Sequence, residues 1–287
     1  MSYRIEGPAV ISFSGGRTSG YMLAQILAAG LQPDVHVLFA NTGKEREQTL
    51  EFVRDCAAAF GVKVVWLERR RPAGESASFA EVDFASANRD GAVFEELLLE
   101  KSHLPNPVTR FCTTELKVRV MKGWMLSHGY KHWTNIVGFR ADEPRRVAKQ
   151  RGKKSRERWD VAFPLFDAGA TKSDVILWWK KQPFDLQLRS WEGNCDLCYL
   201  KGIAKRTRIM EDRPDLAEWW IRQEARREAR QEARFRSDTL DYQSLLAATQ
   251  KQHRMFGNEL FDEASLEDDP TQLDECGGYC ESNLDTA

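Results

Sequence analysis

The stretch Ser12-Phe13-Ser14-Gly15-Gly16-Arg17-Thr18-Ser19 follows the apolar run Ala9-Val10-Ile11 near the start of the chain. A β-branched run that breaks at two glycines and then becomes amphipathic predicts a strand, a tight loop and a helix. Glycines let the backbone approach an anion closely, and the N–H groups of a helix's first turn point at such a group. Serine and threonine hydroxyls add further donors. The stretch is therefore predicted to bind phosphate.

Seven residues of this stretch are expected to surround the phosphate group. The sequence lacks the Gly-Lys-Ser ending of a Walker A loop, so it predicts a different kind of phosphate loop. An ordinary strand-to-helix turn built from small residues is the alternative interpretation. The predicted phosphate-binding residues are Ser12, Ser14, Gly15, Gly16, Arg17, Thr18 and Ser19.

Length and composition limit the class of protein. The chain has 287 residues, 42% of them hydrophobic and 30% charged, which allows one large α/β domain or one domain with a helical appendage. The net charge of −1 conceals a basic stretch at 145–158 and an acidic one after Asp262. We see no signal peptide and no apolar run of about 20 residues, so we expect a cytoplasmic protein. Its six cysteines would then be core residues, metal ligands or catalytic thiols rather than disulfides.

Apolar runs alternate with amphipathic stretches in the first half of the chain. Strands and helices at this spacing predict βαβ units and a parallel sheet. The mixed stretch 69–88 is expected to be a surface connection. Residues 1–170 are predicted to form a nucleotide-binding α/β domain, and 171–287 a helical region that carries a Cys-x-x-Cys motif and a cysteine-containing tail. The expected strands are 10–13, 35–39, 62–67 and 135–139, and the expected helices include 18–29, 45–60, 92–101 and 116–128.

Polar residues follow the second predicted strand at Asn41, Thr42, Gly43 and Lys44. Ligands of open parallel sheets bind outside the carboxyl ends of the strands. We therefore expect Asn41 and Thr42 to contact a nucleotide and Lys44 to offset phosphate charge. The alternative is a helix N-terminus at which Thr42 and Glu45 form a capping box, and the two roles are compatible.

A second polar cluster, formed by Gly138, Arg140, Glu143 and Arg146, follows the last strand of the predicted sheet. The planar guanidinium of Arg140 suits phosphate or sulfate, and we expect it to act in catalysis while Glu143 holds it in place. The basic stretch 145–158 has no periodic apolar face. It is expected to be a loop that closes over an anionic ligand or binds nucleic acid. A surface cluster of salt bridges is the alternative.

Three cysteines lie in two short segments, Cys112 before a predicted helix and Cys195 and Cys198 in a Cys-x-x-Cys loop. Thiolates three residues apart can bind one metal centre, and soft sulfur ligands select zinc or iron–sulfur clusters. A redox pair is the alternative, although the thioredoxin-like pattern that usually accompanies it is absent. Cys276 and Cys280 lie near the C-terminus, where one of them is a candidate fourth ligand. An incidental position in a loosely ordered tail is the alternative for both.

The pattern Ser-x-Ser-Gly-Gly-x-x-Ser of residues 12–19 resembles the PP-loop of the ATP-pyrophosphatases and of their relatives, the phosphoadenosine-phosphosulfate (PAPS) reductases. The Asn-Thr-Gly sequence at 41–43 and the cluster around Arg140 are similar to patterns of the same family. The segments around Cys112 and Cys195 resemble prophage-type PAPS-reductase-like proteins and the sulfur-transfer proteins of DNA phosphorothioation. The resemblance implies a Rossmann-like adenine nucleotide α-hydrolase fold, with a parallel sheet and a C-terminal helical appendage.

The resemblance also implies roles for the cysteines. It implies a [4Fe–4S] cluster at Cys112, Cys195 and Cys198, with Cys280 as the fourth ligand and zinc as the alternative metal. The sequence around Cys276 resembles the C-terminal Glu-Cys-Gly motif of sulfonucleotide reductases, in which the cysteine attacks sulfur. Cys276 is therefore a candidate nucleophile, although the two residues after its glycine depart from that motif.

Together these patterns predict an enzyme that binds ATP or a PAPS-like adenine nucleotide. With ATP and Mg²⁺, a substrate oxygen would attack the α-phosphorus, pyrophosphate would leave, and sulfur from a donor would replace the adenylate. The substrate would be nucleic acid held by the basic stretch. The first alternative is reduction of PAPS or adenylyl sulfate to sulfite with an external thiol carrier protein. The second is a non-catalytic nucleotide- or DNA-binding accessory protein. No membrane partner is expected.

Overall fold

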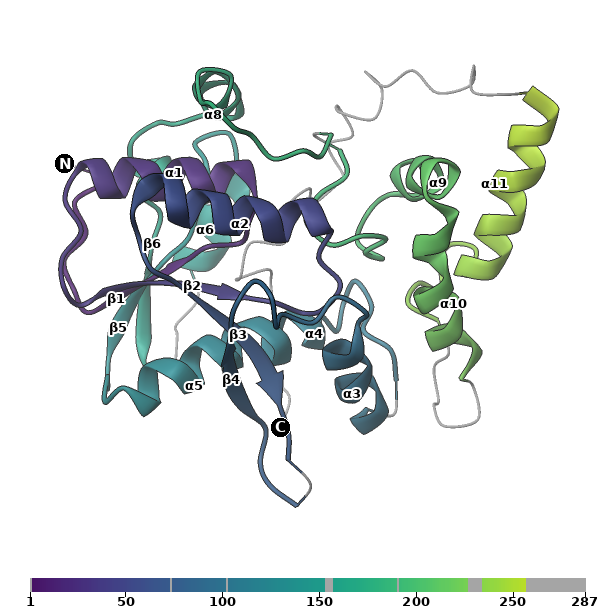
Figure 1. Cartoon of the computed structure of the whole chain (residues 1–287), viewed down its shortest axis with the longest axis horizontal. Helices are drawn as coiled ribbons and strands as arrows, with labels where there is room; N and C mark the ends of the chain where they lie inside the picture. Colours follow the sequence, from purple (N-terminus) through teal and green to yellow (C-terminus); the bar gives the residue numbers. More distant parts are fainter. Residues whose placement is uncertain are drawn as a thin grey trace.

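The computed structural model describes residues 2–72, 74–101, 103–152, 157–189, 191–226 and 234–256. Residues 252–256 are described by their backbone alone. Within these ranges six strands form one sheet in the order β4-β3-β2-β1-β5-β6 (Figure 1). The predicted α/β class with a largely parallel sheet is confirmed. The strands are β1 (Ala9–Ser12), β2 (Val35–Ala40), β3 (Val64–Arg70), β4 (Ser78–Val82), β5 (Trp133–Ile136) and β6 (Trp159–Ala162).

Strand β1 lies in the middle of the sheet and pairs in parallel with β2 on one side and β5 on the other. Its four residues are all buried, which explains why it reads as a continuous apolar run rather than an alternating one. Strand β4 is the antiparallel exception and pairs with β3. The expectation that 69–88 is a surface connection was wrong for the residues of β4. The sequence of this strand shows no clear apolar pattern, because the strand lies at the sheet edge and is only half buried.

Two layers of helices cover the two faces of the sheet (Figure 1). Successive strand residues point to opposite faces, so Ile11 packs in the core on one side and Val10 in the core on the other. Helices α1 (Arg17–Ala28), α2 (Glu47–Phe60) and α8 (Lys172–Trp179) contribute to the first core. The second face is covered by a continuous helical segment made of α4 (Phe111–Thr113), the π-helical turn η1 (Thr114–Val118) and α5 (Arg119–Ser127).

A separate core lies beside the sheet, where the expected C-terminal helical region folds. Helices α9 (Ile203–Asp212), α10 (Ala217–Ala225) and α11 (Tyr242–Phe256) lie together to one side of the sheet (Figure 1). They surround Trp219 and Trp220, and Leu197 and Tyr199 from the Cys-x-x-Cys segment pack in the same core. The division of the chain at residue 170 stays a prediction. The elements are α3 (Ala92–Glu100), α9 (Ile203–Asp212), the 3₁₀ turn η2 (Pro214–Leu216), α10 (Ala217–Ala225) and α11 (Tyr242–Phe256).

The basic stretch 145–158 differs from its expectation, because its first half, 145–151, belongs to helix α6 (Pro144–Arg151). Pro144 occupies the first helical turn, where a missing N–H costs little. Val147 is the single buried residue of this helix and packs with Phe139 and Phe163. One buried side chain in eight residues leaves no apolar periodicity to detect, which is why the helix was missed. A short α7 (Pro164–Asp167) follows β6. No helix among the described residues has the length and apolar character needed to cross a lipid bilayer.

The turn between β1 and α1 depends on Gly15. Its backbone is left-handed, with φ of +77°, and a Cβ there would lie 2.7 Å from Thr49 Cγ2 and 3.0 Å from Val53 Cγ2 on helix α2. Both the backbone angle and the close approach of α2 therefore exclude a side chain. The turn is held against α2 by a contact that only glycine can make.

Gly15→Ala is expected to lower the free energy of unfolding more than Gly30→Ala does. Gly30 also has a positive φ, +95°, but nothing lies within 4 Å of its Cβ position. The control should lose about 1–2 kcal/mol for backbone strain, whereas Gly15→Ala should lose a further 1–3 kcal/mol, roughly, from overpacking. Chemical denaturation measures both losses. Equal losses would show that the contact with α2 is not a constraint.

Candidate functional site

The carboxyl ends of β1 and β5 define the point where the strand order reverses. From β1 the chain crosses to β2 on one side, while β5 and β6 lie on the other. Ligands of open α/β sheets bind at such a switch point. The loop of 13–16 leaves β1 there, and the segment 137–143 leaves β5. The structure therefore brings the two polar clusters that the sequence analysis selected to one edge of the sheet.

The loop after β1 closes upon Ser19, in the first turn of α1. Ser14 Oγ donates a hydrogen bond to Ser19 Oγ at 2.9 Å, and Gly16 N donates to the same oxygen at 3.2 Å. The Ser19 hydroxyl donates to Gly16 O at 2.9 Å. Ser12 is buried and donates to the sulfur of Met121 at 3.7 Å. The loop thus has a fixed shape at the N-terminus of a helix, where the first backbone N–H groups have no acceptor within the helix.

Arg140 joins the second cluster to the first. Its Nη1 donates to Thr18 Oγ1 at 3.2 Å, and its Nε donates to Asp142 at 3.0 Å. Glu143 accepts from the backbone N–H of Arg140 at 3.0 Å and pairs with the guanidinium of Arg146. Gly138 lies close to Ser19, since a Cβ on it would be 3.8 Å from Ser19 Cα. Glu143 therefore holds Arg140, as the sequence predicts, and the same residues also form the cluster of salt bridges that was the alternative.

Arg17 belongs to the phosphate loop in sequence, but its guanidinium is engaged elsewhere. It forms a two-pronged ion pair with Asp185, at 2.8 and 2.9 Å, and donates to the backbone carbonyls of Leu186 and Leu188, the latter at 3.0 Å. These contacts tie α1 to the segment that leads to the Cys-x-x-Cys motif. The structure does not bring this side chain to the other predicted phosphate ligands.

The loop after β2 is shaped by its own side chains. Asn41 is fully buried, and its amide donates to Glu68 at 2.7 Å and to the carbonyl of Asn88 at 2.8 Å. Thr42 donates through both its backbone N–H and its hydroxyl to Glu45, each at 2.8 Å. The bond from the Thr42 N–H is one of the two that define the capping-box alternative, but helix α2 begins later, at Glu47. Gly43 donates its N–H to Asn41 Oδ1 at 3.1 Å and completes the turn.

Lys44 is engaged by the Cys-x-x-Cys segment and by the helical region. Its ammonium forms a buried ion pair with Asp196 at 2.7 Å and lies 4.9 Å from the centre of the Trp219 ring. Asp196 also accepts from Trp220 Nε1 at 2.9 Å. In this arrangement Lys44 joins the β2 loop to the Cys-x-x-Cys segment rather than offsetting phosphate charge.

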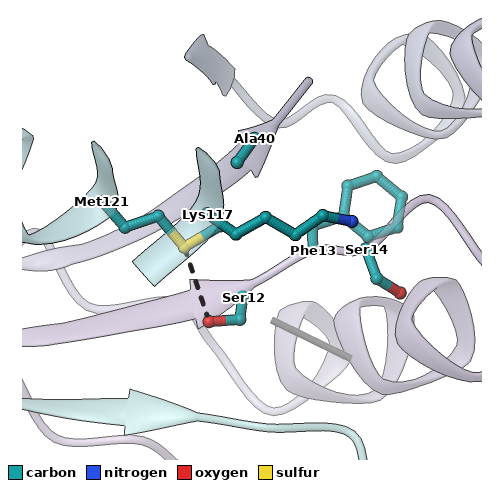
Figure 2. Close-up of a pocket in the computed structure, with 6 residues that line it drawn as sticks. All are labelled: Ser12, Phe13, Ser14, Ala40, Lys117 and Met121. Atoms are coloured by element: carbon teal, nitrogen blue, oxygen red, sulfur yellow. Dashed lines mark hydrogen bonds between the residues drawn. The ribbon is translucent and has the colours of Figure 1, made fainter. Parts of the chain in front are cut away.

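The sequence analysis missed Lys117, which lines a pocket together with residues of the phosphate loop. A small pocket is lined by Ser12, Phe13, Ser14, Ala40, Lys117 and Met121, and the Lys117 side chain runs along it toward Phe13 and Ser14 (Figure 2). Lys117 Nζ is 3.5 Å from Glu45 Oε1. It stands in a π-helical turn, a distortion that is frequent at functional sites. Its signal was its place five residues after Cys112, in a motif examined only for its cysteine.

Cys195 faces the same carboxylate as Lys117. Its Sγ is 3.8 Å from Glu45 Oε1, and its backbone pairs with that of Glu45. Burial raises the pKa of the Cys195 thiol well above its usual range, and Glu45 raises it further, while Lys117 and Lys201 act in the opposite direction. The thiol is therefore protonated near neutral pH in this arrangement.

The other described thiols of the predicted cluster are near the same region. Cys112 Sγ is 3.2 Å from Tyr199 Oη, next to Cys198 in the chain, and both cysteines pack against the core of the helical region. Over the described ranges, no group of three or more His, Cys, Asp or Glu side chains is arranged to hold a metal ion. Cys276 and Cys280 lie outside the described residues. The predicted ligand set stays a prediction.

Comparison with known proteins gives one family match. The model of the phosphoadenosine phosphosulfate reductase domain matches residues 8–185. The uncharacterized nin region protein ORF290 of Escherichia phage lambda is 32% identical over 204 residues, which cover 68% of this chain and 67% of that protein. Two uncharacterized proteins of Methanocaldococcus jannaschii are 25% and 26% identical over 76% and 73% of this chain. These matches span only 41% and 46% of the archaeal proteins.

Among solved structures, the U34-tRNA thiolase NcsA from Methanococcus maripaludis, with its [4Fe-4S] cluster, is similar at a TM-score of 0.39 and 12% sequence identity. The match covers 91% of this chain and 80% of the thiolase. Similarity at this level does not establish a shared activity.

Lys44→Met is expected to lower the free energy of unfolding by about 3–5 kcal/mol, because it leaves the buried Asp196 carboxylate without its cation. Adding Asp196→Asn should recover part of this loss, since the amide oxygen still accepts from Trp220. Arg54→Met removes an exposed ion pair with Asp55 and a cation–π contact with the Phe84 ring, and should cost about 1 kcal/mol. Urea denaturation compares the three proteins. A loss for Lys44→Met as small as that for Arg54→Met would contradict the structural role of Lys44.

Proposed function

We propose, since the chain belongs to the phosphoadenosine phosphosulfate reductase domain family, that it is an enzyme that binds an adenine nucleotide at the switch point between β1 and β5. The phosphates would lie on the loop of Ser14, Gly15, Gly16 and Ser19. The nucleotide in this proposal is ATP, bound together with Mg²⁺. The reaction would transfer the adenylate to an acceptor oxygen and then exchange that adenylate for sulfur.

One observation supports this proposal above the others: two cationic side chains approach the same loop from different elements. Lys117 extends along the pocket from the η1 side, and Arg140 reaches Thr18 from the β5 side. Fixed positive charges around a phosphate chain stabilise the charge that builds up on it in the transition state. Glu45 and Glu143 hold these two cations, so little reorganisation is needed when the phosphate arrives.

The chemistry that follows is attack on the α-phosphorus. A substrate oxygen forms a bond to this phosphorus while the bond to the bridging oxygen breaks, and pyrophosphate leaves with the electron pair. Magnesium, when bound, offsets the charge of the leaving pyrophosphate. Arg140 is assigned to the charge on the α-phosphate and Lys117 to the loop around Ser12 and Ser14. A sulfur nucleophile from a donor protein then forms a bond to the carbon that bears the adenylated oxygen, and the bond between this carbon and the oxygen breaks, so that AMP leaves with the oxygen and the electron pair.

The exposed basic side chains of α6 support a nucleic acid as the acceptor. Arg145, Lys149 and Arg151 are exposed on this helix, which begins one residue after Glu143. Clustered lysine and arginine side chains bind nucleic acid through its phosphates, whatever its sequence. The acceptor would therefore lie along α6, beside the nucleotide.

An iron–sulfur cluster held by Cys112, Cys195, Cys198 and Cys280 is the second part of the proposal. The donor chemistry fits, because thiolates are the usual cluster ligands and Lys117 and Lys201 would offset their charge. The arrangement of the three described thiols is not itself a metal site. When bound, the cluster would supply a place for sulfur to be activated, and adenylation of the acceptor would proceed without it.

Reduction of PAPS or adenylyl sulfate is the alternative function, favoured by the family's name. The Cys276 thiolate would attack the sulfur, adenosine 3′,5′-bisphosphate would leave in the PAPS case, and an external thiol carrier would release sulfite. A non-catalytic nucleotide- or DNA-binding protein would bind the nucleotide and turn over neither substrate.

Anaerobic protein is expected to form pyrophosphate from ATP and Mg²⁺ when a nucleic acid acceptor is present. Lys117→Ala should lower kcat/KM about 10²- to 10³-fold, because a fixed charge on the phosphates is lost. Lys122→Ala is the matched control, since Lys122 pairs with Glu157. Sulfite from PAPS, lost in Cys276→Ser, would favour the reductase instead. Binding of a nucleotide without formation of pyrophosphate or sulfite would favour the non-catalytic accessory role. If neither ATP nor PAPS binds, the proposed nucleotide site is rejected.

Iron content tests the cluster separately. Anaerobically purified protein is expected to contain about four iron atoms and to absorb visible light, as [4Fe–4S] proteins do. Cys195→Ser and Cys198→Ser should lose both signals, whereas Cys56→Ser, at a buried position in the sheet core, should keep them. A colourless protein that contains stoichiometric zinc would contradict the iron–sulfur cluster and favour zinc, the alternative metal.

A further inference from the structure

The Cys-x-x-Cys segment is paired with the loop after β2 by backbone hydrogen bonds. Arg46 N donates to Asn194 O at 2.9 Å, and Asp196 N donates to Lys44 O at 2.9 Å. Glu45 and Cys195 are opposite each other in this short antiparallel bridge. The segment that carries Cys195 is therefore fixed in register to the edge of the sheet where the candidate nucleotide site lies.

The side chain of Asn194 connects the same segment directly to the phosphate loop. Its Nδ2 donates to the backbone carbonyl of Ser14 at 2.8 Å, across 180 residues of sequence. Ser14 in turn donates to Ser19, the residue on which the loop closes. Thr49 Oγ1 lies 3.4 Å from the carbonyl of Asn194 and adds a contact from α2. A change in the position of Ser14 thus acts on the residue next to Cys195.

The far side of the segment is held as firmly. Lys201 donates to the carbonyls of Cys195 and Asp196, the latter at 2.9 Å, and the Asp196 carboxylate binds Lys44 and Trp220. Both ends of the segment are therefore restrained. Asn194, Cys195 and Asp196 are thus bonded to protein groups on both sides of the segment.

We propose that Asn194 is a positioning residue that couples nucleotide occupancy of the phosphate loop to the conformation of the Cys195–Cys198 segment. This inference rests on the proposed nucleotide site and adds to it a means by which that site and the thiols act together. A bound nucleotide fixes the position of Ser14. The backbone carbonyl of Ser14 then holds the Asn194 side chain, and with it the backbone of 194–196, which is paired with that of 44–46. Coupling of this kind is reciprocal, so Asn194 also contributes to nucleotide affinity.

Amide hydrogen exchange of the peptide 190–200 measures the coupling without depending on activity or on metal content. The probes are α,β-methylene ATP with Mg²⁺ and adenosine 3′,5′-bisphosphate. In the wild-type protein, the probe that binds should slow exchange about 5-fold or more, within the usual range of coupling between sites. Asn194→Ala should abolish most of this nucleotide-dependent slowing and weaken nucleotide binding by a similar factor.

Two further variants make the result decisive. Asn194→Asp keeps the size of the side chain but cannot donate to Ser14 O, so it should behave like Asn194→Ala even if the latter folds poorly. Gln187→Ala is the control, because Gln187 is exposed on the preceding segment and donates to the nearby carbonyl of Asp185. A purely structural role for Asn194 would speed exchange equally with and without nucleotide and leave the ratio unchanged.

The outcomes separate the two proposals. If calorimetry detects no binding of either probe to the wild-type protein, the proposed function fails, and the coupling fails with it. If a probe binds and both Asn194 variants retain the wild-type slowing ratio, the coupling is wrong while the nucleotide site stands. Loss of the ratio in both variants, with Gln187→Ala unchanged, supports it.

Discussion

The contact between Gly15 and helix α2 is the constraint on which the candidate site depends. A left-handed backbone at Gly15 turns the chain from β1 into α1, and α2 lies so close that no Cβ fits. This contact places the N-terminus of α1 at the switch point of the sheet, beside the segment that leaves β5. The serine hydroxyls, Arg140 and Lys117 are then arranged around a loop whose shape depends on this backbone geometry.

The second level of organisation is the attachment of the helical region to this site. Arg17 holds the segment of 185–188, Asn194 binds the phosphate loop, and Lys44 forms a buried ion pair with Asp196. Charged residues that look like phosphate ligands in the sequence therefore serve to join two parts of the chain. The Lys44–Asp196 pair is buried, so either charge would be costly without its partner, whereas Arg17 and Asp185 are partly exposed.

Much of the fold and part of the site could be predicted from the sequence. The β1–α1 turn was predictable because a buried strand, two glycines and an amphipathic helix leave a local signature. The placement of Arg140 beside the loop followed from the general geometry of parallel sheets. Long-range pairing was not predictable: nothing near Lys44 or Arg17 in the sequence indicates Asp196 or Asp185. Helix α6 and strand β4 were missed because each buries too little to show a period, and Lys117 because its motif was read for cysteine alone.

A crystal structure with α,β-methylene ATP and Mg²⁺ tests the central claim most directly. The account predicts phosphate oxygens within hydrogen-bonding distance of the loop between Ser14 and Ser19, with Lys117 and Arg140 on either side of the phosphate chain. A nucleotide bound away from the carboxyl ends of β1 and β5, with this loop unoccupied, would contradict it.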